Sequence, residues 1–134
     1  AAMAPAAVDT IETHLNEMNL EPDFYDIIAT GDLGFTGYAI AQELFVKKGI
    51  KLNKNVYTDC GILIYGNNPK VFSGASGCAC SAVVTYGHFL NRMRKGELKR
   101  ILIVATGALL SPMSYQQKET IPCIAHAVSI EYIQ

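Results

Sequence analysis

The chain has 134 residues, of which 50% are hydrophobic and 17% are charged, and its formal net charge is -1. This balance is typical of one globular domain and excludes a disordered tail. The near-neutral charge does not suggest a nucleic-acid-binding surface, and the most basic stretch, Arg92–Arg100, is interpreted as a solvated helix end. No apolar run approaches the roughly 20 residues of a membrane span.

The first half of the chain predicts two helices around one buried strand. Pro5–Asn19 is expected to form a helix, because its apolar residues recur on one face. Phe24–Thr30 is a short apolar run, which is typical of a buried parallel strand. Gly31–Gly37 follows as a turn rich in glycine, and Tyr38–Lys48 as a second helix that ends at Gly49.

The second half predicts three strands and one more helix. Leu52–Thr58 is a polar loop, and Cys60–Tyr65 and Arg100–Thr106 are apolar runs of strand length. The helix is expected over Ala82–Lys95, and the last strand over Ile121–Ile130. Each of these segments is bounded by turn residues, mainly glycine, proline and asparagine.

Alternating helices and strands predict the α/β class, with a mostly parallel or mixed sheet and helices packed on it. No long linker interrupts the sequence, so residues 1–134 are expected to form one domain. Met3 follows two alanines, and the first residues lack the basic start of a signal peptide. We therefore expect the chain to begin in the middle of a longer protein.

Asp32 follows the first predicted strand, at the end of a parallel sheet where α/β proteins place their ligands. The neighbouring glycines, Gly31, Gly34 and Gly37, do not have the spacing of a dinucleotide-binding loop. Two interpretations of Asp32 remain open. Its carboxylate either faces a ligand or accepts hydrogen bonds from the backbone amides of its own turn.

Small residues fill the loop Ser73–Ser81, which opens a predicted helix. Backbone amides at a helix start favour an anion, which makes Cys80 and Ser81 candidate ligand residues, although Ser81 is equally suited to cap the helix. A helix start also lowers a thiol pKa, but a catalytic Cys needs a base. His88 lies about two turns along the helix from Cys80, so we favour structural cysteines.

His126 lies in the apolar last strand, and Thr106 ends the strand that we expect to pair with it. A buried and hydrogen-bonded His126 is the common explanation, and a ligand-facing role is the alternative. The cysteines and histidines do not follow the spacing of a zinc site, so we expect no metal and no cofactor. Buried thiols in a reducing compartment are the favoured interpretation of the cysteines.

Four long strings carry a resemblance to a known family: Thr30–Gly34, Ser73–His88, Leu98–Pro112 and Tyr115–Val128. In these strings the chain resembles the stage V sporulation protein AD family of spore-forming bacteria, over its carboxy-terminal portion alone. The resemblance implies a thiolase-like fold, in which two similar α/β halves pack together. The amino-terminal half would be absent from this chain.

The resemblance also implies a function. The family binds dipicolinic acid (pyridine-2,6-dicarboxylate), free or as its calcium chelate, and belongs to the machinery that moves it into the forming spore. It associates peripherally with the spore inner membrane, beside other stage V sporulation membrane proteins. We take Asp32, Cys80, Ser81, Thr106 and His126 as candidate ligand-binding residues.

The alternative is an acyl-transfer or condensing enzyme of the thiolase superfamily. Condensing enzymes place a His in the loop that here is Gly31–Gly34, and a His or Asn in the loop that here contains Cys78–Cys80. Neither loop has the residue expected, which argues against condensation chemistry and for a protein that is not an enzyme. An isolated half would expose apolar surface, so we expect a homodimer or a need for the amino-terminal half.

Overall fold

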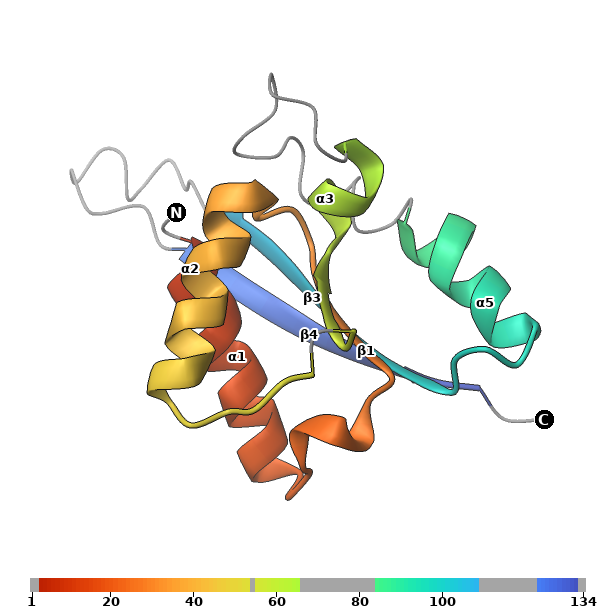
Figure 1. The fold of residues 1–134 in the computed structure, drawn as a ribbon, viewed down its shortest axis with the longest axis horizontal. Helices are drawn as coiled ribbons and strands as arrows, with labels where there is room; N and C mark the ends of the chain where they lie inside the picture. Colours follow the sequence, from red (N-terminus) through yellow and green to blue (C-terminus); the bar gives the residue numbers. More distant parts are fainter. Residues whose placement is uncertain (1–2, 54, 66–83, 109–122, 133–134) are drawn as a thin grey trace, which may run out of the picture.

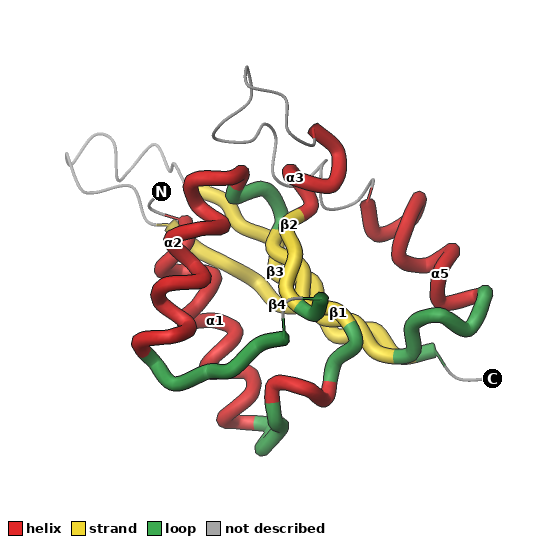
Figure 2. Tube along the Cα trace, in the orientation of Figure 1, coloured by secondary structure: helices red, strands yellow, loops and turns green. Residues whose placement is uncertain are grey.

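The computed structural model describes residues 3–53, 55–65, 84–108 and 123–132. Helices and strands alternate along the chain, which confirms the α/β class (Figures 1 and 2). In chain order the elements are α1 (Met3–Glu17), the short helix η1 (Pro22–Phe24), β1 (Ile27–Thr30), α2 (Gly34–Lys47), β2 (Tyr57–Asp59), α3 (Cys60–Tyr65), the π-helical turn η2 (Thr85–Phe89), α5 (Leu90–Arg94), β3 (Arg100–Ala108) and β4 (Cys123–Glu131).

The strands form one mixed sheet in the order β2-β1-β3-β4. β1 pairs in parallel with both β2 and β3, with Thr30 opposite Asp59 on one side and Val104 on the other. β4 runs antiparallel to β3 and places His126 opposite Ala105. The carboxyl ends of β1, β2 and β3 therefore lie at the same edge of the sheet.

Helices α1 and α2 cover one face of the sheet (Figure 1). The buried residues of α1 recur at the spacing of one helix face, which explains why this segment folds as an amphipathic helix: Ala4, Ala7, Val8, Ile11 and Leu15. They share a core with Ile28 of β1 and with Leu102 and Val104 of β3.

Helix α5 and the turn η2 lie on the opposite face (Figure 1). Phe89 and Met93 are almost completely buried against Ile101 and Ile103, the residues of β3 that alternate with those of the first core. Gly96 follows α5 with a φ of 79°, as Gly49 follows α2 with a φ of 73°. Both glycines thus adopt the left-handed conformation that commonly ends a helix.

The predicted strand Cys60–Tyr65 is wrong, because these residues form the helix α3. The strand lies just before it, at Tyr57–Asp59, partly inside the segment predicted as the loop Leu52–Thr58. An apolar run of six residues fits a buried strand and a short buried helix equally well. Here Asp59 decides between them, because its Oδ2 accepts a hydrogen bond from the backbone N–H of Ile62 (3.3 Å) and so caps the helix.

Candidate functional site

The turn after β1 and the junction of β2 with α3 meet at the carboxyl edge of the sheet. Asp59 lies at this meeting point and is completely buried. Its Oδ1 accepts hydrogen bonds from Thr30 Oγ1 (2.5 Å) and Leu33 N (2.8 Å). Its Oδ2 accepts from Gly34 N (3.1 Å) and Ile62 N (3.3 Å). This carboxylate therefore ties the first turns of α2 and α3 to the end of β1.

These hydrogen bonds also correct the predicted start of the second helix. We expected it to begin at Tyr38, after a turn of seven residues, but α2 begins at Gly34. The amides of Leu33 and Gly34, which a helix start leaves without a helical partner, are bonded by Asp59. The sequence did not identify Asp59. Its one signal was an Asp directly before an apolar run, which is a common residue at a helix start.

Asp32 is close to Asp59 and 9% exposed. A Cβ atom added to Gly61 would lie 2.3 Å from Asp32 Oδ1 and 3.0 Å from Asp59 Oδ2. The two carboxylates therefore converge on Gly61, where only a glycine leaves room for both. Asp32 thus lies at the carboxyl edge as predicted, in a mostly buried position.

Two further candidates lie near the same edge. Thr106 belongs to β3, two residues after Val104, and its backbone pairs with Ala125 of β4. His126 pairs with Ala105 and is exposed, which contradicts the buried histidine that we considered the common explanation. The two residues therefore lie in successive cross-strand pairs of the sheet, and successive pairs face opposite sides of it. Cys80 and Ser81 lie outside the described residues.

His14 of α1 has a structural role. His14 Nε2 lies 2.6 Å from the hydroxyl oxygen of Tyr25, and that hydroxyl donates to Ser129 Oγ (3.1 Å). This chain of hydrogen bonds joins α1 to β4. Cys60 is buried at the start of α3, as expected of a structural thiol.

Two stacked tyrosines lie between the sheet and α2. The rings of Tyr38 and Tyr57 are 4.7 Å apart and nearly parallel, and Phe45 meets Tyr57 edge-on at 5.1 Å. Tyr57 also lies within hydrogen-bonding distance of Thr30, with 3.2 Å between their hydroxyl oxygens. Burial raises the pKa of Tyr57 well above 10.0, and this outweighs a lowering by the Thr30 hydrogen bond. Burial and, secondarily, the charge of Asp59 raise the pKa of Tyr38.

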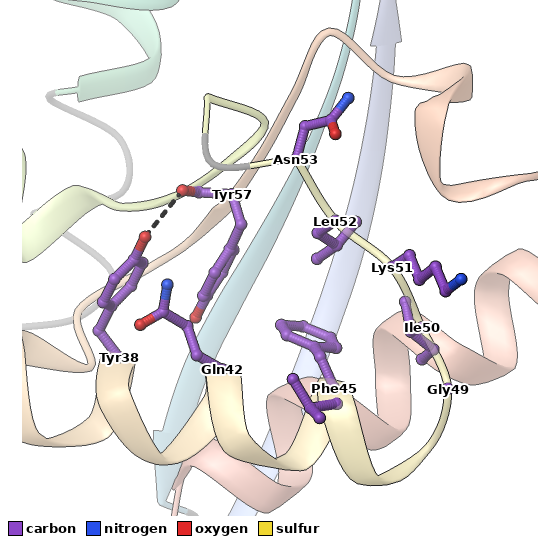
Figure 3. A pocket seen from close by; sticks show the side chains of 10 residues that line it. Tyr38, Gln42, Phe45, Gly49, Ile50, Lys51, Leu52, Asn53 and Tyr57 are labelled. Carbon is purple, nitrogen blue, oxygen red and sulfur yellow. Dashed lines mark hydrogen bonds between the residues drawn. The ribbon is translucent and has the colours of Figure 1, made fainter.

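The same rings form the floor of a cavity of about 390 Å³ beside the edge strand β2 (Figure 3). We call this cavity the aromatic groove. It lies between the second half of α2 and the segment that leads into β2. Its lining residues are Tyr38, Gln42, Phe45, Val46, Gly49, Ile50, Lys51, Leu52, Asn53 and Tyr57.

Neither a metal site nor a membrane span was found in the part of the chain that the structure describes. Its His, Cys, Asp and Glu side chains do not gather in groups of three or more that could hold a metal ion. Its helices are too short or too polar to cross a membrane. Asp32 and Asp59 thus belong to no such group among the described residues.

Comparison with known proteins identifies the family. Residues 1–131 match the family described as Stage V sporulation protein AD (SpoVAD). The chain is 52% identical over 131 residues to Stage V sporulation protein AD of Bacillus subtilis (strain 168). This match covers 98% of the chain but 38% of that relative, so the chain spans well under half of the relative's length. The resemblance seen in the sequence is confirmed, and the chain belongs to the Stage V sporulation protein AD family.

Proposed function

We propose that this chain forms part of a protein that binds dipicolinic acid without catalysis, within the machinery that takes dipicolinate up into the spore. The observation that carries the proposal is the match to a sporulation family, with 52% identity over 98% of the chain. The chain then corresponds to the carboxy-terminal α/β half of a thiolase-like protein. The mixed sheet with helices on both faces is compatible with this role.

The charge at the carboxyl edge favours one form of the ligand. Dipicolinate is a dianion, and at close range the carboxylate of Asp32 repels it. Ca²⁺, in contrast, prefers oxygen ligands such as an Asp carboxylate. We therefore assign Asp32 to the calcium ion of a calcium–dipicolinate chelate. The exposed imidazole of His126 is assigned to the ligand carboxylates, and Cys80, Ser81 and Thr106 stay further candidates for the same role.

A role without catalysis is supported by how the polar groups near this edge are used. Both oxygens of Asp59 accept two hydrogen bonds each, so this carboxylate is occupied as a structural acceptor. The raised pKa of Tyr57 keeps its phenol protonated at neutral pH. Neither group is suited to take a proton from a substrate at that pH.

We further propose that the sheet face that carries α5 contacts the remainder of the protein where β4 leaves that face uncovered. Val128 and Tyr132 on or after β4 are 55% and 38% exposed, although both are large and hydrophobic. The Bacillus subtilis relative has sequence beyond the part that this chain matches, and such sequence would cover this surface. The assembled protein would form a homodimer at the periphery of the spore inner membrane, beside other stage V sporulation membrane proteins.

Calorimetric titration of the protein at its full natural length tests this function. We expect dipicolinate to bind, and the Asp32→Asn substitution to weaken binding of the calcium chelate by roughly tenfold while affecting free dipicolinate less. Asp26→Asn is the control, because Asp26 is an exposed carboxylate at the other end of β1, where it accepts hydrogen bonds from two backbone N–H groups. Absence of heat at millimolar dipicolinate would remove the proposal. Equal effects of the two substitutions would remove Asp32 from the site.

A further inference from the structure

Gly61 is the second residue of α3, and the carboxylates of Asp32 and Asp59 both approach it. A Cβ atom at this position would overlap Asp32 Oδ1, and it would lie 3.0 Å from Asp59 Oδ2. The backbone itself does not require glycine here, because Gly61 is not among the glycines with a positive φ. The requirement for glycine is therefore steric, and it comes from the two carboxylates.

The two carboxylates differ in how easily they can move. Asp59 is completely buried, and it accepts four hydrogen bonds, from the end of β1, the start of α2 and the first turn of α3. A shift of Asp59 would therefore break bonds to three elements at once. Asp32 extends from the turn between β1 and α2, and its Oδ1 is the atom that an added carbon would meet first. A side chain at position 61 would thus displace the carboxylate of Asp32 before that of Asp59.

We infer that Gly61 is a positioning residue, which by its lack of a side chain sets where the carboxylate of Asp32 lies at the carboxyl edge of the sheet. The consequence for a ligand rests on the proposed function, in which Asp32 binds the calcium ion of the chelate. Ca²⁺ holds its oxygen ligands at roughly 2.3–2.6 Å, so a displacement on the order of 1 Å removes a ligand. The steric contact between Gly61 and Asp32 does not depend on that function.

A double-mutant cycle on the stability of the protein at its full natural length tests the contact. Gly61→Ala should lower the equilibrium constant for folding by roughly tenfold, because an added carbon in a packed site forces its neighbours to shift. In the Asp32→Ala background the same change should cost no more than about twofold, since the oxygen that the carbon meets first is then gone. Asp26→Ala is the matched background, because Asp26 is exposed at the other end of β1, and there the loss should persist in full.

Calorimetric titration with the two forms of the ligand tests the consequence for the site. Gly61→Ala should weaken binding of the calcium–dipicolinate chelate by roughly tenfold, as Asp32→Asn does, and should affect free dipicolinate less. In the Asp32→Ala background, Gly61→Ala should leave the remaining affinity for the chelate unchanged, because it acts through Asp32. A general structural defect would instead weaken both forms of the ligand alike.

The outcomes separate this inference from the proposed function. If the unmodified protein binds neither form of dipicolinate, the proposed function fails, and the stability cycle alone decides the inference. The inference is overturned if Gly61→Ala costs the same stability with and without Asp32→Ala, or if it weakens free dipicolinate as strongly as the chelate. If Gly61→Ala alone does not fold, recovery of the fold by Asp32→Ala supports the inference, and failure to recover overturns it.

Discussion

At the scale of single residues, Asp59 has the largest predicted effect on stability. It is completely buried and accepts four hydrogen bonds, three of them from backbone amides. Asp59→Ala leaves these donors without an acceptor in a buried site, and we expect a loss of about 3 kcal/mol or more in the free energy of unfolding. Asp59→Asn keeps one acceptor oxygen, but in either orientation its NH₂ group points at one or two backbone donors, so it should also destabilise. Chemical denaturation of the full-length protein measures both losses.

Asp26 is the control for Asp59, because it also accepts hydrogen bonds from backbone amides but is exposed to solvent. Asp26 Oδ2 accepts from Lys99 N (2.7 Å) and Arg100 N (3.1 Å) at an exposed position. Water replaces these bonds when the carboxylate is removed, so Asp26→Ala should cost only about 1 kcal/mol. If the two alanine variants lose the same stability, then the hydrogen bonds of Asp59 contribute no more than exposed ones, and its role as the tie between α2 and α3 is wrong.

At the scale of elements, the sequence predicted the helices and strands whose patterns are unambiguous. α1 and β3 were predicted because one has a buried stripe of helical period and the other is a continuous apolar run. β2 was not predicted, because it has three residues, too few to show a period, and begins in a polar segment. α3 was predicted as a strand because its capping bond comes from Asp59, whose position depends on tertiary contacts with Thr30 and Leu33. Asp32 was predicted as a candidate because it follows a strand. Its closeness to Gly61 was not predicted, because it depends on tertiary packing.

Tyr57 joins β2 to β1 and to α2, and this makes the junction sensitive to alkaline pH. The pKa of Tyr57 is raised in the folded chain, so on raising the pH the unfolded chain releases this proton first, near 10.0. The stability that depends on the neutral phenol is thus complete below pH 10.0 and falls as the pH rises above it. Tyr57→Phe should cost about 1 kcal/mol at neutral pH, through the lost bond to Thr30, and should reduce the alkaline loss. Phe45→Leu disturbs the same packing without changing a titrating group, so it should lower the stability equally at neutral pH and above pH 10.0. If Tyr57→Phe keeps the steep loss of stability at alkaline pH, Tyr57 is not its cause.

At the scale of the whole molecule, the two faces of the sheet differ in how completely they are covered. The face under α1 and α2 is closed by a continuous core, while β4 leaves Val128 55% exposed on the face that carries α5. We expect the chain by itself to self-associate or to unfold without cooperativity, and to form a stable complex when it is co-expressed with the part of the relative that it does not match. Val128→Asp should reduce that complex in co-purification, because a carboxylate is costly to bury in an apolar contact. Val46→Asp is the matched control, since Val46 is 77% exposed on α2 at the opposite side of the sheet. A monodisperse and cooperative monomer in sedimentation and thermal unfolding would contradict the expectation, and so would equal effects of the two aspartates.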